Sequence, residues 1–136
     1  MAESSQHLDL VKTVRNTVCK REDVVSSLVE AEDHEENVVV HFSTPEGYRP
    51  DVYYNDEDLL IIGEAKTPSD LFSSHSEAQF DSYLKYLQGE ANIKKVFLYV
   101  GVPWTEFKRA KNRFRKIKPS SVDIMVVCDL GYTEGV

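Results

Sequence analysis

Hydrophobic residues recur close to helical spacing from His7 to about Asp33, with charged residues filling most of the positions between them. This pattern predicts one long helix or two consecutive helices over that stretch. Acids dominate residues 30–36, and the β-branched run Val38–Val40 that follows favours a first strand over about residues 38–43.

Two further extended segments, Asp51–Tyr54 and Leu59–Lys66, flank the acidic turn Asn55–Asp58 and form the two strands of a predicted hairpin. With four residues in the turn, Tyr54 pairs with Leu59.

Helix and strand signals alternate through the second half of the chain. Ser74 and Glu77 match the S-x-x-E capping box, and Gly89 marks the end of the helix that they begin. The other predicted elements are a strand over residues 96–100, a helix that begins at Pro103 and ends before Pro119, and a strand over residues 122–128.

The predicted order is therefore α, β, β, β, α, β, α, β. Such an order indicates an α/β fold with a mixed β-sheet flanked by helices. No linker is long enough to separate two domains, so residues 1–136 are expected to form one domain. With 136 residues, 41% of them hydrophobic, the chain can bury a core without disulfide or metal staples.

The composition of the chain limits the compartments and the classes of partner that can be expected. Cys19 and Cys128 lie far apart and belong to no metal-binding or redox motif, which is typical of buried thiols in a reducing compartment. No apolar run approaches the roughly 18 residues of a membrane span, so a cytoplasmic protein without a membrane partner is expected. The formal net charge of −7, taken alone, argues against nucleic acid, because phosphate binding depends on Lys and Arg.

Charged residues at the end of an apolar strand carry the candidate chemistry. Glu64 and Lys66 are two residues apart, so both side chains point to the same face of the sheet. The predicted hairpin register places Asp51 opposite Ile62 and diagonal to Glu64, about 7–8 Å away at the backbone. Two carboxylates at that spacing can close around one cation.

A hard divalent ion such as Mg²⁺ takes one or two carboxylates together with carbonyl and water oxygens. The sequence therefore predicts a Mg²⁺ or Mn²⁺ site formed by Asp51, Glu64 and the Ala65 carbonyl. Lys66 beside it would orient water or offset charge on a phosphate, which is the equipment of phosphodiester hydrolysis. Gly63 and Ala65 point to the opposite face and are small enough to let a helix pack closely behind the site.

Pro50 and Asp51, followed by Glu64, Ala65 and Lys66, resemble the PD-(D/E)XK motif of the restriction-endonuclease-like nuclease superfamily. The predicted element order is also similar to the core topology of that superfamily. The resemblance implies that Asp51 and Glu64 are metal ligands and that Lys66 is the catalytic lysine.

Two further roles follow from the same resemblance. Gln79 is similar in placement to a glutamine that several branches use near the site, and the KTPSD segment after Lys66 loosely resembles the VRR-NUC and Holliday-junction-resolvase branches. Many members also use a glutamate on the first helix. Glu22, Asp23 and Glu30 compete for that role here, and helix phase does not choose between them.

Residues 94–118 contain nine bases and one acid, Glu106, a net charge of +8 that leaves −15 for the rest of the chain. Arg109, Arg115 and Lys116 lie on the side of the predicted helix away from the apolar stripe of Trp104, Phe107, Phe114 and Ile117. They form either a solvated face or a phosphate-binding ridge. The stripe itself is expected in the core.

Few other side chains are candidates for substrate or metal contact. Tyr48, beside Arg49 in a Gly-containing loop, is a candidate substrate contact. The four histidines, His7, His34, His41 and His75, form no metal-ligand spacing and are expected at the surface or at helix caps.

These features together predict a Mg²⁺- or Mn²⁺-dependent endonuclease that cleaves DNA in a structure-selective or nonspecific manner. A homodimer or a subunit of a larger complex is expected by analogy with the family. Two alternatives stay open at this point: a noncatalytic nucleic-acid-binding or assembly module on a degenerate nuclease fold, and an RNA endonuclease.

Overall fold

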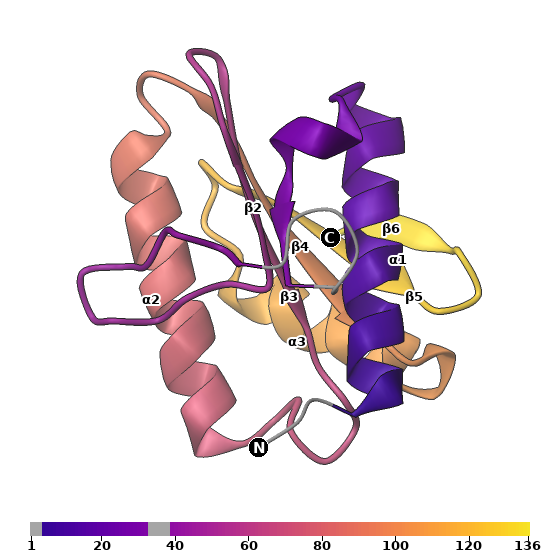
Figure 1. Ribbon diagram of the computed structural model, residues 1–136. Helices are drawn as coiled ribbons and strands as arrows, with labels where there is room; N and C mark the ends of the chain where they lie inside the picture. Colours follow the sequence, from indigo (N-terminus) through magenta and orange to yellow (C-terminus); the bar gives the residue numbers. More distant parts are fainter. Residues whose placement is uncertain (1–3, 33–38) are drawn as a thin grey trace.

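A computed structural model describes residues 4–32 and 39–136. A six-stranded mixed sheet lies between two helical layers (Figure 1). Helix α1 (Ser5–Glu22) covers one face, and helices α2 (Ser74–Glu90) and α3 (Phe107–Ile117) cover the other. The α/β class and the mixed sheet predicted from the sequence are confirmed.

The strands are β1 (Glu30–Ala31), β2 (Val52–Asn55), β3 (Leu59–Ala65), β4 (Lys95–Val102), β5 (Asp123–Cys128) and β6 (Thr133–Gly135). They lie in the sheet in sequence order. β3, β4 and β5 are parallel, and the other pairs are antiparallel. Each parallel connection crosses over through a helix, α2 or α3, on the same face of the sheet.

Helix α1 is shorter than the predicted stretch of residues 7–33. The Ser4 side chain caps its start by accepting a hydrogen bond from the His7 backbone N–H, and Asp23 ends it in a left-handed conformation. Of the remaining described residues, Ser26–Leu28 form a 3₁₀ turn and Glu30–Ala31 form β1.

The strand predicted over residues 38–43 is wrong for residues 39–43, which form no strand; residue 38 lies outside the described part. β1 occupies the edge of β2 instead, through the pairs Glu30↔Tyr53 and Ala31↔Val52. The His41 backbone N–H donates to the Glu30 side chain rather than to a strand. Phe42 stacks on Tyr53 with ring centroids 4.4 Å apart, so this segment packs over the sheet by its side chains.

The hairpin of β2 and β3 is confirmed, but its register differs from the predicted one by two residues. Tyr54 pairs with Ile61 and Val52 with Gly63. The Asp56 carboxylate accepts hydrogen bonds from the backbone N–H groups of Asp58 and Leu59, which tightens the turn. Because side chains alternate with a period of two, the shift keeps every residue on its predicted face.

The later elements agree closely with the sequence. Ser73 rather than Ser74 caps α2, by accepting from the Ser76 N–H, and the helix continues through Gly89 to Glu90. Pro103 precedes a 3₁₀ turn, Trp104–Glu106, that leads into α3. β6 was not predicted. In the part of the chain that the structure describes, no helix is long and apolar enough to cross a membrane.

Two apolar clusters fill the spaces on either side of the sheet. α1 packs Val14 against Gly63 and Gly101, so closely that a Cβ on Gly101 would lie 2.4 Å from Val14 Cγ2. The expectation of a helix close behind the site is therefore confirmed. On the other face, Phe114 is buried, but Trp104 is 58% exposed and Ile117 is also exposed, so the predicted aromatic stripe enters the core only in part.

Candidate functional site

A cavity of about 380 Å³ opens at the carboxyl end of β3. α1 contributes its first turn, the chain before β2 contributes Arg49 and Asp51, and α2 contributes Gln79. The end of β3 and the loop behind it supply Glu64, Ala65, Lys66, Thr67 and Asp70. Ligand sites of open α/β sheets lie in the crevice at this end of the strands.

Asp51 and Glu64 meet as the sequence predicted. The register places them directly opposite one another rather than diagonally, since Val52 pairs with Gly63. Both side chains are buried, and their carboxyl groups are in hydrogen-bond contact. The backbone N–H of Ala65 donates to Asp51 Oδ2 over 2.9 Å, which holds the Asp51 carboxylate against the end of β3.

A closed ring of polar contacts joins Glu64 to Lys66. The Tyr83 hydroxyl donates to Glu64 Oε1 over 2.9 Å, and Gln79 Nε2 donates to the Tyr83 hydroxyl over 3.0 Å. Lys66 Nζ donates to Gln79 Oε1 over 2.5 Å and lies 3.6 Å from Glu64 Oε2. All four side chains are buried, so each is held in one position.

Burial, followed by the negative charge of Asp51, raises the pKa of Glu64 well above its ordinary value, although Lys66 acts in the opposite direction. The pKa of Tyr83 is raised as well, chiefly by burial and by the charge of Glu64. The Tyr83 hydroxyl therefore stays protonated and donates a hydrogen bond to Glu64. Such perturbed groups in a cleft are typical of functional sites.

Sequence reasoning did not identify Tyr83, His7 and Arg49 as site residues. Tyr83 follows Gln79 by four residues and so shares its helix face, a signal that was available. His7 Nε2 lies 3.2 Å from Asp51 Oδ2, a contact that only the tertiary structure creates. Arg49 lines the cavity and pairs with Glu32 at 3.1 Å.

Other candidates lie away from this cavity. Tyr48 packs against the α2-side core, with its ring 5.8 Å from that of His75, and does not line the cavity. Glu22 accepts from the Tyr99 hydroxyl near the far end of α1, Asp23 caps that end, and Glu30 binds His41. None of these three acids lines the cavity.

The donor set at the cavity fits a hard divalent ion in its chemistry, because two buried carboxylates in contact need a cation or a proton between them. Asp51 and Glu64 supply the oxygens, and Ala65 lines the same wall. As they stand, the side chains of residues 4–32 and 39–136 bring together no group of three or more His, Cys, Asp and Glu arranged to hold a metal ion.

The basic residues of α3 divide between the two ends of the sheet. Arg109 lies near the start of α3, with its guanidinium 4.7 Å from the Phe72 ring in the loop that follows Lys66. Arg115 and Lys116 lie in the last turn, toward the opposite end of the strands, because α3 runs back from the end of β4 to the start of β5.

Acids offset part of this charge: Arg109 pairs with Glu106 of the same segment, Lys111 pairs with Glu134, and Arg113 pairs with Glu77. Three of the bases in α3 are therefore paired with acids, as on a solvated helix face.

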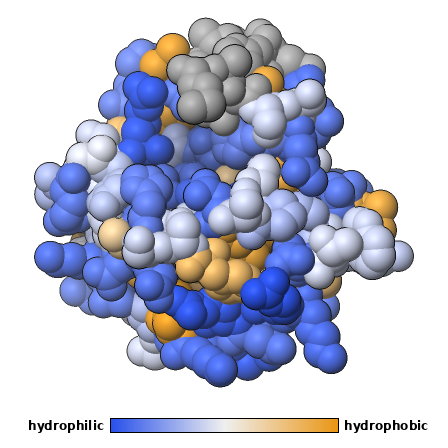
Figure 2. Space-filling view, turned by 90° about the horizontal axis from the view of Figure 1, so that it is seen from below, coloured by the Kyte–Doolittle hydropathy of each residue, from blue (hydrophilic) through white to orange (hydrophobic). Residues whose placement is uncertain are grey.

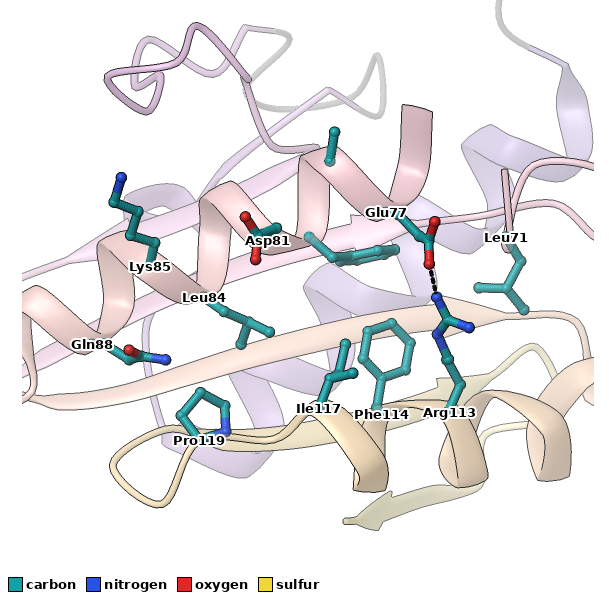
Figure 3. Close-up of a pocket in the computed structure, with 12 residues that line it drawn as sticks. Leu71, Glu77, Asp81, Leu84, Lys85, Gln88, Arg113, Phe114, Ile117 and Pro119 are labelled. Atoms are coloured by element: carbon teal, nitrogen blue, oxygen red, sulfur yellow. Dashed lines mark hydrogen bonds and ion pairs between the residues drawn. The ribbon is translucent and has the colours of Figure 1, made fainter. Parts of the chain in front are cut away.

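A second cavity of about 610 Å³ lies between α2 and α3 (Figure 3). Its floor is apolar, with Leu84, Phe114 and Ile117 pointing into it, and the Glu77–Arg113 ion pair spans one end. Its charged groups lie on the rim and do not converge.

The view from the end where α1 begins shows a mostly hydrophilic face with a smaller apolar area near its centre (Figure 2).

No family model, curated protein or solved structure matches the chain.

Proposed function

We propose that this chain has a restriction-endonuclease-like core and acts as a Mg²⁺- or Mn²⁺-dependent nuclease that hydrolyses phosphodiester bonds in DNA. The observation that carries the proposal is the buried contact between Asp51 and Glu64, with Lys66 Nζ 3.6 Å from the same glutamate, at the wall of an open cavity. We place the activity in the cytoplasm, since the two cysteines of the sequence lie far apart and belong to no metal-binding or redox motif.

Asp51, Glu64 and the Ala65 carbonyl would hold the divalent ion. When bound, such an ion supplies Lewis-acid chemistry, lowering the pKa of water and offsetting charge on the phosphate. Asp51 is held for this role by the Ala65 N–H, and Glu64 by the Tyr83 hydroxyl. These two hydrogen bonds limit the rotation of both carboxyl groups.

Lys66 acts on the substrate side of the cavity. Its ammonium group has three protons, of which Gln79 accepts one, so the others can face a phosphate oxygen or an attacking water molecule. Lys66 Nζ also lies 3.6 Å from Glu64 Oε2 and 3.8 Å from Asp70 Oδ2. Gln79 is a positioning residue in this scheme, because it acts through Lys66.

Cleavage of duplex DNA, branched DNA and single-stranded RNA, each with Mg²⁺ or Mn²⁺, tests the proposal. We expect Asp51→Asn and Lys66→Ala to slow cleavage by at least about a hundredfold. Lys95→Ala, at the opposite end of β4, is the matched control and should cut like the parent. Variants at Asp51 and Lys66 that cut as fast as the parent would overturn the assignment. Faster cleavage of the single-stranded RNA than of either DNA would identify RNA, rather than DNA, as the substrate.

One observation favours a noncatalytic binding module as the second candidate. Lys66 and His7 already supply a positive charge and a hydrogen-bond donor to the two carboxylates, so the polar contacts are satisfied without an ion. Calorimetry with Mn²⁺ separates the two candidates. A nuclease site binds the ion and loses it in Glu64→Ala, whereas a binding module shows no ion site that depends on Glu64.

A further inference from the structure

His7 lies on the first turn of α1, far in sequence from the motif, yet its side chain lines the same cavity as Asp51 and Glu64. The imidazole is 16% exposed and the Asp51 side chain 11% exposed. His7 Nε2 lies 3.2 Å from Asp51 Oδ2. An ionised carboxylate only accepts hydrogen bonds, so the imidazole donates through Nε2.

Two donors therefore converge on one oxygen of Asp51. The Ala65 N–H reaches Oδ2 from β3 over 2.9 Å, and His7 reaches it from α1. With Oδ2 occupied from two directions, the rotation of the carboxylate is fixed, and its other oxygen is left for a further partner. Glu64 is in hydrogen-bond contact with the same carboxylate.

We propose that His7 is a positioning residue that orients the Asp51 carboxylate for divalent-ion binding, and that it does so through the Nε2–Oδ2 hydrogen bond. The inference rests on the proposed function. Carboxylates that bind metal ions are themselves commonly held by hydrogen bonds, and removal of such a partner typically lowers metal affinity by about 10- to 100-fold.

The position of His7 follows from how α1 begins. Ser4 accepts from the His7 backbone N–H and so fixes the first turn. The packing of Val14 against Gly63 and Gly101 then sets how closely α1 approaches the end of β3. Replacement of the imidazole leaves the helix cap intact, because the cap uses the backbone of residue 7.

Calorimetry with Mn²⁺ on the whole chain tests the role of His7. We expect His7→Ala to weaken Mn²⁺ binding by about 10- to 100-fold without lowering the melting temperature in chelator. His7→Gln should restore most of the affinity, since its amide can donate to the same oxygen. His41→Ala is the matched control: His41 Nδ1 also lies 3.2 Å from a carboxylate, Glu30, but its side chain is 81% exposed. It should bind Mn²⁺ like the parent.

Three outcomes would overturn the inference. Equal affinity of His7→Ala and the parent would show that Asp51 is oriented without His7. A His7→Gln variant as weak as His7→Ala, with imidazole nitrogen coupling in pulsed EPR of Mn²⁺ bound to the parent, would make His7 a direct ligand instead. A parent that binds no Mn²⁺, or binding that survives Glu64→Ala, would remove the proposed function itself and this inference with it.

Discussion

Among the residues of the candidate site, Glu64 is the one whose burial lowers the stability of the folded protein. Its carboxyl group is buried beside Asp51, which raises its pKa well above the ordinary value for a glutamate. The folded protein therefore keeps a proton on Glu64 at pH values where the unfolded chain has released it. Stability contributed by this group falls as the pH rises from the ordinary pKa toward the raised one.

We expect Glu64→Gln to increase the free energy of unfolding in chelator at about pH 8 by about 1–3 kcal/mol, because an amide carries no charge to bury. At about pH 4, where glutamate is largely protonated in both states, the difference should shrink. Urea denaturation at the two pH values measures it. Glu57→Gln, in the exposed turn between β2 and β3, serves as the control. A Glu64→Gln variant less stable than the parent at the higher pH would contradict this account.

At the scale of elements, the contact between α1 and the β3–β4 pair decides where the site lies. Gly63 lies on β3 and Gly101 on β4, two residues out of register with each other, and Val14 of α1 occupies the space that their missing side chains leave. The close approach brings the first turn of α1, and with it His7, to the end of β3. A wider spacing would separate His7 from Asp51.

Gly101→Ala should lower the free energy of unfolding by about 1–3 kcal/mol, since the added Cβ would lie 2.4 Å from Val14 Cγ2. Gly89→Ala is the matched control. Gly89 lies in α2 with no atom within 4 Å of an added Cβ, so alanine there should stabilise the helix by roughly 0.5–1 kcal/mol. Combining Gly101→Ala with Val14→Ala should recover part of the loss. Urea denaturation of Gly101→Ala, Val14→Ala, the double variant and Gly89→Ala measures this effect. Losses that simply add in the double variant would contradict the contact.

At the scale of the whole molecule, acids that lie far apart in the sequence come next to the bases of α3, so the charge of a sequence segment is not the charge of the surface on which it lies. Six of the nine bases of residues 94–118 lie in α3, and Glu77, Glu106 and Glu134 pair with three of them. The start of α3 adjoins the loop after Lys66 through the contact of Arg109 with Phe72. A net charge of −7 therefore does not exclude nucleic acid. If the chain binds nucleic acid as proposed, we expect the binding surface to lie at the end of the sheet where α3 begins.

We expect Arg109→Glu to weaken binding of an oligonucleotide and to reduce the slope of log affinity against log salt by about 1. Arg115→Glu and Lys116→Glu should have smaller effects, because the last turn of α3 lies toward the end of the sheet opposite the candidate site. Fluorescence anisotropy across a salt series, with Mn²⁺ present, compares the three variants. Equal losses in all three would instead favour a ridge along the whole helix.

Local patterns were sufficient for most of the fold. The alternation of Leu60, Ile62 and Glu64 placed the two carboxylates and Lys66 on one face, and a hairpin register wrong by two residues left that assignment intact. Helices were found from their caps and apolar spacing. Residues 39–43 of the predicted strand at 38–43 form no strand, because β-branched residues favour extended backbone without specifying a partner, and β1 takes the edge of β2.

The sequence by itself determined the α/β class, the hairpin and the shared face of Asp51, Glu64 and Lys66, because those features depend on short-range periodicity and on a single turn. Gln79 was predicted from the family resemblance alone. Only the tertiary structure decided that Tyr83 completes the contacts between Glu64 and Lys66, and that His7 reaches Asp51. The latter contact spans 44 residues. It depends on how closely α1 packs on two glycines, a property of assembled surfaces rather than of any local pattern.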